Sequence, residues 1–140
     1  MTIKTVPYPL CGLDYVYVIV PVKRTADGTE YIDLPMNVIE RAIAIKLIEE
    51  RVPIRGAEVR FLRAALGITL REWAKLFGFS AAGVNKWEKT RTKRLAPVNE
   101  AAIRALCAER LDVGIEGKWS DLVATAKVPK RLSLRIDSAA

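Results

Sequence analysis

The sequence predicts an α+β protein in which a β-hairpin and a helix precede an all-α bundle. Three observations support this prediction. β-Branched and aromatic residues are concentrated at positions 13–22, an Asp27-Gly28 turn signal follows, and apolar residues then recur at helical spacing. The length of 140 residues is that of a single compact body. We divide it into an N-terminal unit of residues 1–55, a helical domain of residues 56–112 and a C-terminal tail of residues 113–140.

The N-terminal unit is expected to contain a hairpin and one helix. The first strand, in "LDYVYVIVPV", has two apolar faces, formed by Tyr15, Tyr17 and Ile19 and by Val16, Val18 and Val20. Both faces therefore need cover, which a helix in "PMNVIERAIAIKLIEER" can supply. Pro35 suits the first turn of this helix, which is expected to end before Pro53. The residues predicted on its inner face are Met36, Ile39, Ile43 and Leu47.

Three short helices are predicted next, in "AEVRFLRAALG", in "TLREWAKLFG" and after Ser80. Capping residues mark their ends: Gly67, Thr69, Gly78 and Ser80. Their inward residues are predicted to be Val59, Leu62, Leu66, Trp73, Phe77, Val84 and Trp87. Only Gly78 and Phe79 separate the second helix from the third. This pattern is typical of a helix-turn-helix, whose second helix enters the major groove of DNA.

A fourth helix is predicted after Pro97, in "VNEAAIRALCAERL". Its inward residues are predicted to be Val98, Ala102, Ala105 and Leu106. In the tail, a short helix can form at 119–126, and Leu132, Leu134 and Ile136 of "RLSLRI" share one face. This tail can be an edge strand in a dimer, a basic arm or a partly disordered segment.

The composition disfavours an enzyme or a metal protein. The sequence has no histidine, which excludes imidazole bases and histidine-ligated metals, and it has no glycine-rich phosphate loop. Cys11 and Cys107 are far apart and lack the paired spacing of structural zinc sites, so we expect free thiols, with Cys107 in the core. We therefore predict no catalytic residue, no metal ligand and no cofactor. No stretch is long enough to cross a bilayer and no export signal is recognisable, so a soluble, cytoplasmic protein is expected.

Positive charge is concentrated in one part of the chain. The net charge is +7, with 0 in residues 1–55, +4 in residues 56–117 and +3 in residues 118–140. Five basic residues and one acidic residue, Glu88, lie between Lys86 and Arg94. Such a local cluster indicates a face for a polyanion, most plausibly nucleic acid, although an ordinary solvated basic face gives the same pattern.

Residues 57–106 resemble the Xre/Cro-type helix-turn-helix regulators, and most closely the DNA-binding half of MqsA-like antitoxins. The features that carry the resemblance are "RFLR", "LGIT", the segment "LFGFS" across the turn, the Trp87-Glu88 pair and "IRAL". More weakly, "GLDYVYV" and "IERAIA" extend it to residues 11–110. The resemblance implies a lambda-repressor-like bundle that binds DNA. The chain lacks the family's cysteine-rich zinc domain, and Leu70 stands where the family usually has a glutamine that helps to hold a phosphate.

The predicted recognition helix begins with Ser80, Ala81 and Ala82, where the family usually has Ser-Arg-Gln. The residues expected to read bases are Ala81, Ala82, Asn85 and Lys86, because alanine methyls can contact thymine, asparagine can pair with adenine and lysine can reach guanine. The residues expected to contact phosphates are Thr69, Ser80, Lys89, Thr90, Arg91, Lys93 and Arg94. With so few polar readers, we expect weak direct reading, assisted by DNA shape.

The sequence thus predicts a transcriptional regulator, more specifically a repressor that binds an inverted repeat of double-stranded DNA as a homodimer. The alternative is an antitoxin or antiactivator that acts mainly by binding a toxin or activator protein. In that alternative, the small side chains Ala81, Ala82 and Gly83 admit a neighbouring helix instead of a DNA groove.

Overall fold

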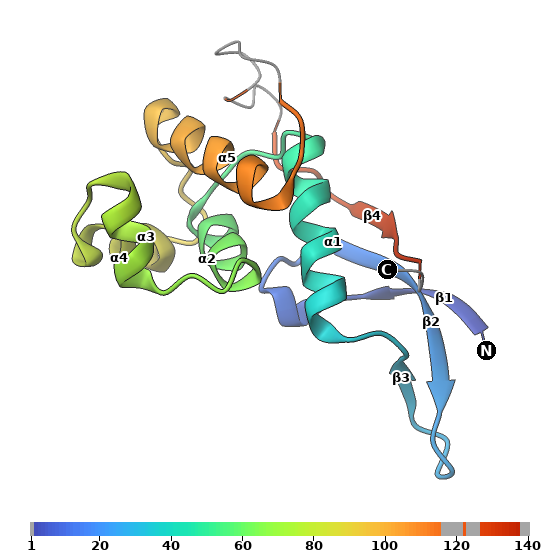
Figure 1. Ribbon diagram of the computed structural model, residues 1–140. Helices are drawn as coiled ribbons and strands as arrows, with labels where there is room; N and C mark the ends of the chain where they lie inside the picture. The colour runs from blue at the N-terminus through green and yellow to red at the C-terminus, as the bar shows by residue number, and fades with distance from the viewer. Residues whose placement is uncertain (1, 116–121, 123–126, 138–140) are drawn as a thin grey trace.

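The computed structural model describes residues 2–115, 122 and 127–137, and within them the chain is a mixed α+β protein. A four-stranded sheet and helix α1 (Met36–Glu49) form one end of the molecule (Figure 1). Helices α2 (Gly56–Ala65), α3 (Leu70–Phe77) and α4 (Ala81–Lys89) form the other. Helix α5 (Pro97–Leu111) packs against α1 and so connects the two ends.

Strand β2 (Val16–Arg24) is the centre of the sheet. Strand β1 (Thr2–Pro7) pairs antiparallel along one side of it, and β3 (Glu30–Ile32) pairs antiparallel with the end of its other side. The predicted hairpin is confirmed, with Gly28 in its turn at a φ of 89°. Strand β1 was not predicted, because "TIKTVP" mixes polar and apolar residues too evenly for a clear strand signal.

The C-terminal strand β4 (Leu132–Arg135) completes the sheet. It runs parallel to the first half of β2, from Val16 opposite Leu132 to Ile19 opposite Arg135. The predicted shared face is confirmed, because Leu132, Leu134 and Ile136 are all buried. The tail therefore adds a strand to the sheet of its own chain. The short helix expected at 119–126 lies largely outside the described residues.

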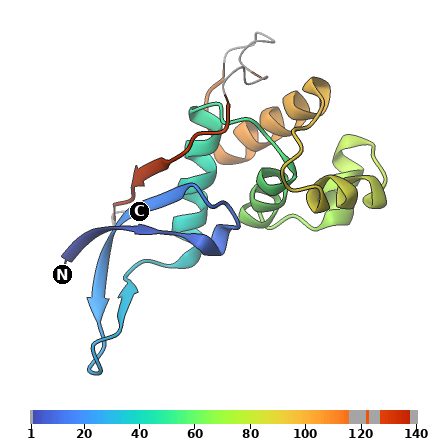
Figure 2. The ribbon, with the colours of Figure 1, turned by 180° about the vertical axis from the view of Figure 1, so that it is seen from behind.

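Helix α1 lies across one face of the sheet (Figure 1). The predicted inner residues Ile39, Ile43 and Leu47 are buried, but Met36 is 54% exposed and that part of the prediction is wrong. Pro35 is the N-cap, so Met36 lies at the first helical position, beyond the edge of the contact between α1 and the sheet. Figure 2 shows that no helix of the described residues covers the opposite face of the sheet, where Tyr17 is only half-buried. Within the described residues, a helix therefore covers one face of the sheet, whereas cover on both faces had been expected.

The caps predicted for the short helices are confirmed. Gly67 and Gly78 adopt left-handed conformations, with φ of 67° and 71°. The hydroxyl oxygen Oγ1 of Thr69 accepts a hydrogen bond from the Glu72 N–H at 3.2 Å. The hydroxyl oxygen Oγ of Ser80 accepts a hydrogen bond from the Gly83 N–H at 3.0 Å. These local signals place α2, α3 and α4 at the predicted positions.

The predicted inner face of α5 is wrong by about one position. Val98 is 68% exposed and Ala105 is exposed, whereas Cys107 is buried as predicted. The residues of α5 that are buried are Glu100, Ala101, Ile103, Arg104, Cys107, Ala108 and Leu111. The apolar pattern missed this face because two charged residues belong to it and were assumed to face solvent.

Gly56 allows an unusually close approach of two helices. Gly56 is the first residue of α2 and lies against the C-terminal end of α4. A Cβ atom on residue 56 would overlap the carbonyl oxygen of Trp87. The same atom would lie 2.6 Å from the carbonyl oxygen of Thr90. Because both neighbours are backbone atoms, they cannot move aside without shifting the end of α4.

We predict that Gly56→Ala lowers the free energy of unfolding by about 3 kcal/mol, the upper end of the usual cost of overpacking. The measurement is urea denaturation followed by circular dichroism. Gly114→Ala is the matched control, because among the described residues other than its chain neighbours no atom lies within 4 Å of its added Cβ. Equal stabilities of the two variants would contradict the close approach.

Candidate nucleic-acid interface

Helices α3 and α4 are joined by three residues and held together by aromatic side chains. Trp73 is buried and meets Phe77 edge-to-face at 5.1 Å between ring centroids. Phe79, in the connection, meets Trp87 of α4 in the same manner at 4.8 Å. Val84 anchors α4 in the core. Helix α4 therefore has a fixed inner side, and its other side faces away from the sheet (Figure 1).

The outer side of α4 carries the four residues predicted to read bases. Ala81, Ala82 and Lys86 are exposed and Asn85 is half-buried. At 100° per residue, these four positions and Lys89 form one continuous arc opposite Val84. The structure therefore brings the predicted readers together on one side of α4, where three of the four are exposed.

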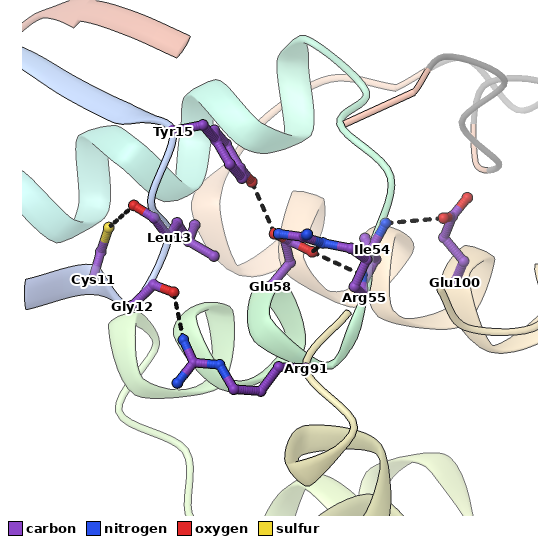
Figure 3. Close-up of polar contacts among 9 residues, drawn as sticks. All are labelled: Cys11, Gly12, Leu13, Tyr15, Ile54, Arg55, Glu58, Arg91 and Glu100. Carbon is purple, nitrogen blue, oxygen red and sulfur yellow. Dashed lines mark hydrogen bonds and ion pairs between the residues drawn. The ribbon is translucent and has the colours of Figure 1, made fainter. Parts of the chain in front are cut away.

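The predicted phosphate contacts divide into two groups. Lys89 and Lys93 are exposed, as is the predicted base reader Lys86, and within the described residues these three ammonium groups have no hydrogen bond or ion pair. In contrast, Arg91 donates a hydrogen bond to the carbonyl oxygen of Gly12 at 2.7 Å (Figure 3). Arg94 is paired with Glu100, with N···O distances of 3.1 and 3.2 Å. The two arginines thus brace the loop after α4, while Lys86 and Lys89 on α4 and Lys93 in the loop are exposed.

The three hydroxyl residues predicted to contact phosphate are all exposed, and each hydroxyl already forms a hydrogen bond with a backbone group. Thr69 and Ser80 cap α3 and α4, as described above. The Thr90 hydroxyl donates to the carbonyl oxygen of Lys86 at 2.9 Å, at the C-terminal end of α4. Each hydroxyl lies at the end of a helix on the α3–α4 side of the molecule, and each oxygen has remaining capacity for a further hydrogen bond.

An electropositive hollow of about 300 Å³ lies between the end of α4 and the start of α5. Its polar lining residues are Lys86, Thr90, Lys93, Arg94 and Asn99, and Trp87 forms an apolar wall. Helix α5 begins here without a side-chain cap, and the N-terminus of a helix carries partial positive charge. The cationic side chains and this helix end favour an anion at this position.

The structural role of Glu88 was not predicted from the sequence, where it was noted only as the acidic residue of the basic cluster and as part of the Trp87-Glu88 pair. The carboxylate is buried and pairs with Arg63 of α2 through two bonds, of 2.8 and 2.9 Å. The hydrogen bond to Glu88 raises the pKa of Arg63. This pair fixes the position of α4 against α2. Because 25 residues separate the partners, no local spacing in the sequence could have indicated the contact.

No protein-family model matches the chain, and comparisons with curated proteins and with solved structures found no match. No helix within the described residues is long and apolar enough to cross a membrane. The same residues contain no cluster of three or more acidic or cysteine side chains that could hold a metal ion. The function must therefore be inferred from the surface of α4 and its surroundings.

We predict that Glu88→Gln lowers the free energy of unfolding by about 2 kcal/mol, because it removes a hydrogen-bonded ion pair from a largely buried site. Thermal denaturation or urea titration measures the loss. Glu72→Gln is the matched control, since its side chain is exposed on α3. If both variants were as stable as the natural sequence, the Arg63–Glu88 pair would not hold α4 in place.

Proposed function

We propose that the chain is a sequence-specific double-stranded DNA-binding protein and that α3 and α4 form its helix-turn-helix. The observation that carries the proposal is the outer arc of α4, where Asn85, Lys86 and Lys89 lie together and their side chains have no hydrogen-bond or ion-pair partner among the described residues. A helix that projects in this way has the diameter needed to enter the major groove. The aromatic contacts and the Glu88 pair keep it in one orientation.

The residues on this arc support a limited direct reading of bases. The amide of Asn85 can form two hydrogen bonds with adenine, and Lys86 can reach guanine. Ala81 and Ala82 offer only methyl groups, which suit the methyl of thymine. Because two of the four positions lack polar atoms, part of the specificity comes from DNA shape and from a second half-site.

Phosphate contacts are assigned first to Lys89 and Lys93, which are exposed and unpaired within the described residues. Thr69, Ser80 and Thr90 add hydroxyl contacts at helix ends. Arg91 and Arg94 contribute to the field around the loop while they brace it, so their removal would disturb the loop as well as any phosphate contact. Lysines alone are sufficient for salt-dependent binding to the phosphate backbone of DNA.

We further propose that the protein acts as a homodimeric transcriptional repressor on an inverted repeat. A two-fold dimer matches two half-sites about one helical turn apart, which compensates for weak reading in each half. The experiment is fluorescence anisotropy with labelled DNA from upstream of the protein's own gene and with a scrambled duplex, at two salt concentrations. Preferential binding that persists at near-physiological salt is the expected result. Equal binding to both duplexes that disappears with salt would contradict the proposal.

We predict that Asn85→Ala reduces the preference for the operator over scrambled DNA by about tenfold, because one bidentate base contact contributes about 1–3 kcal/mol of discrimination. Competition anisotropy with both duplexes measures the ratio of affinities. Asn37→Ala is the control, since Asn37 is exposed on α1 and far from α4. An unchanged ratio in the Asn85 variant would remove this residue as a reader.

A second function is favoured by the N-terminal unit, which exposes several large apolar side chains. Leu10 is 71% exposed, and Ile3, Tyr31 and Met36 are also exposed. Such side chains are typical of a protein interface, as expected for an antitoxin or antiactivator. In this alternative the N-terminal unit binds a protein partner. Equal binding to operator and scrambled DNA that disappears with salt would support this alternative.

A further inference from the structure

We infer that a second DNA phosphate site lies between α2 and α4 and that Arg60 is its main donor. This inference rests on the proposed function and identifies a contact that sequence analysis did not predict. The groove has a volume of about 460 Å³ and is lined by Arg60, Arg63, Asn85, Glu88, Lys89 and Arg91. It therefore runs directly beside Asn85, on the side of α4 opposite the hollow that contains Lys93.

The charge of this groove favours an anion. Four of its lining residues are cationic and one is anionic, and the single carboxylate, Glu88, is already neutralised by Arg63. Arg60, Lys89 and Arg91 remain as an excess of three positive charges around an open groove. A phosphodiester is the anion that DNA presents, and guanidinium groups bind phosphate oxygens with two parallel hydrogen bonds.

Arg60 differs from the other arginines of the groove because its side chain has no partner in the part of the chain that the structure describes. Arg63 is committed to Glu88 and Arg91 to the carbonyl oxygen of Gly12. Arg60 is exposed in the middle of α2, and within the described residues its guanidinium has no hydrogen bond or ion pair. It can therefore turn toward a ligand without leaving a buried carboxylate unpaired.

The two cationic sites lie on opposite flanks of α4, and this arrangement matches the geometry of a major groove. The groove is about 12 Å wide and bounded by the phosphates of two strands, while a helix with its side chains is about 10–12 Å across. With α4 between the strands, Arg60 faces the phosphates of one strand and Lys93 faces those of the other. The two contacts together fix how deeply α4 enters and how it is rotated.

The test compares Arg60→Ala with Arg110→Ala, which removes the same charge from an exposed position on α5 outside both sites. Loss of one phosphate contact reduces the slope of log K against log salt by about 0.9, which corresponds to about fivefold weaker binding at 0.15 M salt. We expect this change for operator and scrambled DNA alike in the Arg60 variant, and almost none in the Arg110 variant. Arg60→Lys should restore most of the salt slope.

Methylphosphonate substitution, which makes single phosphates neutral, identifies the strand. A neutral phosphate at the Arg60 contact should weaken binding of the natural protein but leave the Arg60→Ala variant unaffected. The phosphate whose neutralisation no longer weakens binding in the Lys93→Ala variant should lie on the other strand. If the natural protein binds DNA but Arg60→Ala behaves like Arg110→Ala, the inference fails and the proposed function stands. If the natural protein does not bind DNA, both fail.

Discussion

The buried carboxylate of Glu58 holds the two ends of the molecule in one arrangement. It accepts hydrogen bonds from the Tyr15 hydroxyl at 2.9 Å, from the Arg55 backbone N–H at 2.9 Å and from the Arg55 guanidinium at 2.7 and 2.8 Å (Figure 3). A buried charge is tolerated only when it is paired and hydrogen-bonded in this way. Burial, with the nearby Glu58 charge, raises the pKa of Tyr15, so the phenol stays protonated and keeps donating. The sheet end and α2 are therefore joined by one saturated polar site.

The same arrangement recurs where the loop after α4 returns to the core. Glu100 is fully buried, accepts a hydrogen bond from the Ile54 N–H at 3.0 Å and pairs with Arg94. Backbone bonds run alongside, from the Leu95 N–H to the Ile54 oxygen and from the Ala57 N–H to the Arg91 oxygen. Contacts from the loop after α4 and from α5 thus meet at the start of α2. These contacts fix the orientation of α4 relative to the rest of the molecule.

The sequence predicted the elements that depend on neighbouring residues. The hairpin turn, the glycine caps and the Thr69 and Ser80 caps all act within a few residues, so their signals are visible in a single stretch of sequence. Contacts between distant residues were not predictable in this way: Tyr15 meets Glu58 across 43 positions and Arg63 meets Glu88 across 25. The inner face of α5 was misassigned for a related reason. The rule that charges face solvent fails for Glu100, because its partners come from other parts of the chain.

Buried carboxylates also determine which cations remain for a polyanion. Arginine has a planar, forked group that satisfies a carboxylate or carbonyl with fixed geometry, whereas lysine is a flexible point charge. In this fold Arg55, Arg63 and Arg94 serve buried carboxylates, and the ammonium groups of α4 and its loop stay unpaired within the described residues. A count of charges along the sequence treats paired arginines and unpaired lysines alike, and so overstates the number of cations available to a polyanion. Within the described residues, the unpaired cations around α4 are mainly lysines. Under the proposed function, Lys89 and Lys93 attract the phosphate backbone without reading it, and discrimination between sequences falls to Asn85, Lys86 and the fit of α4 in the groove.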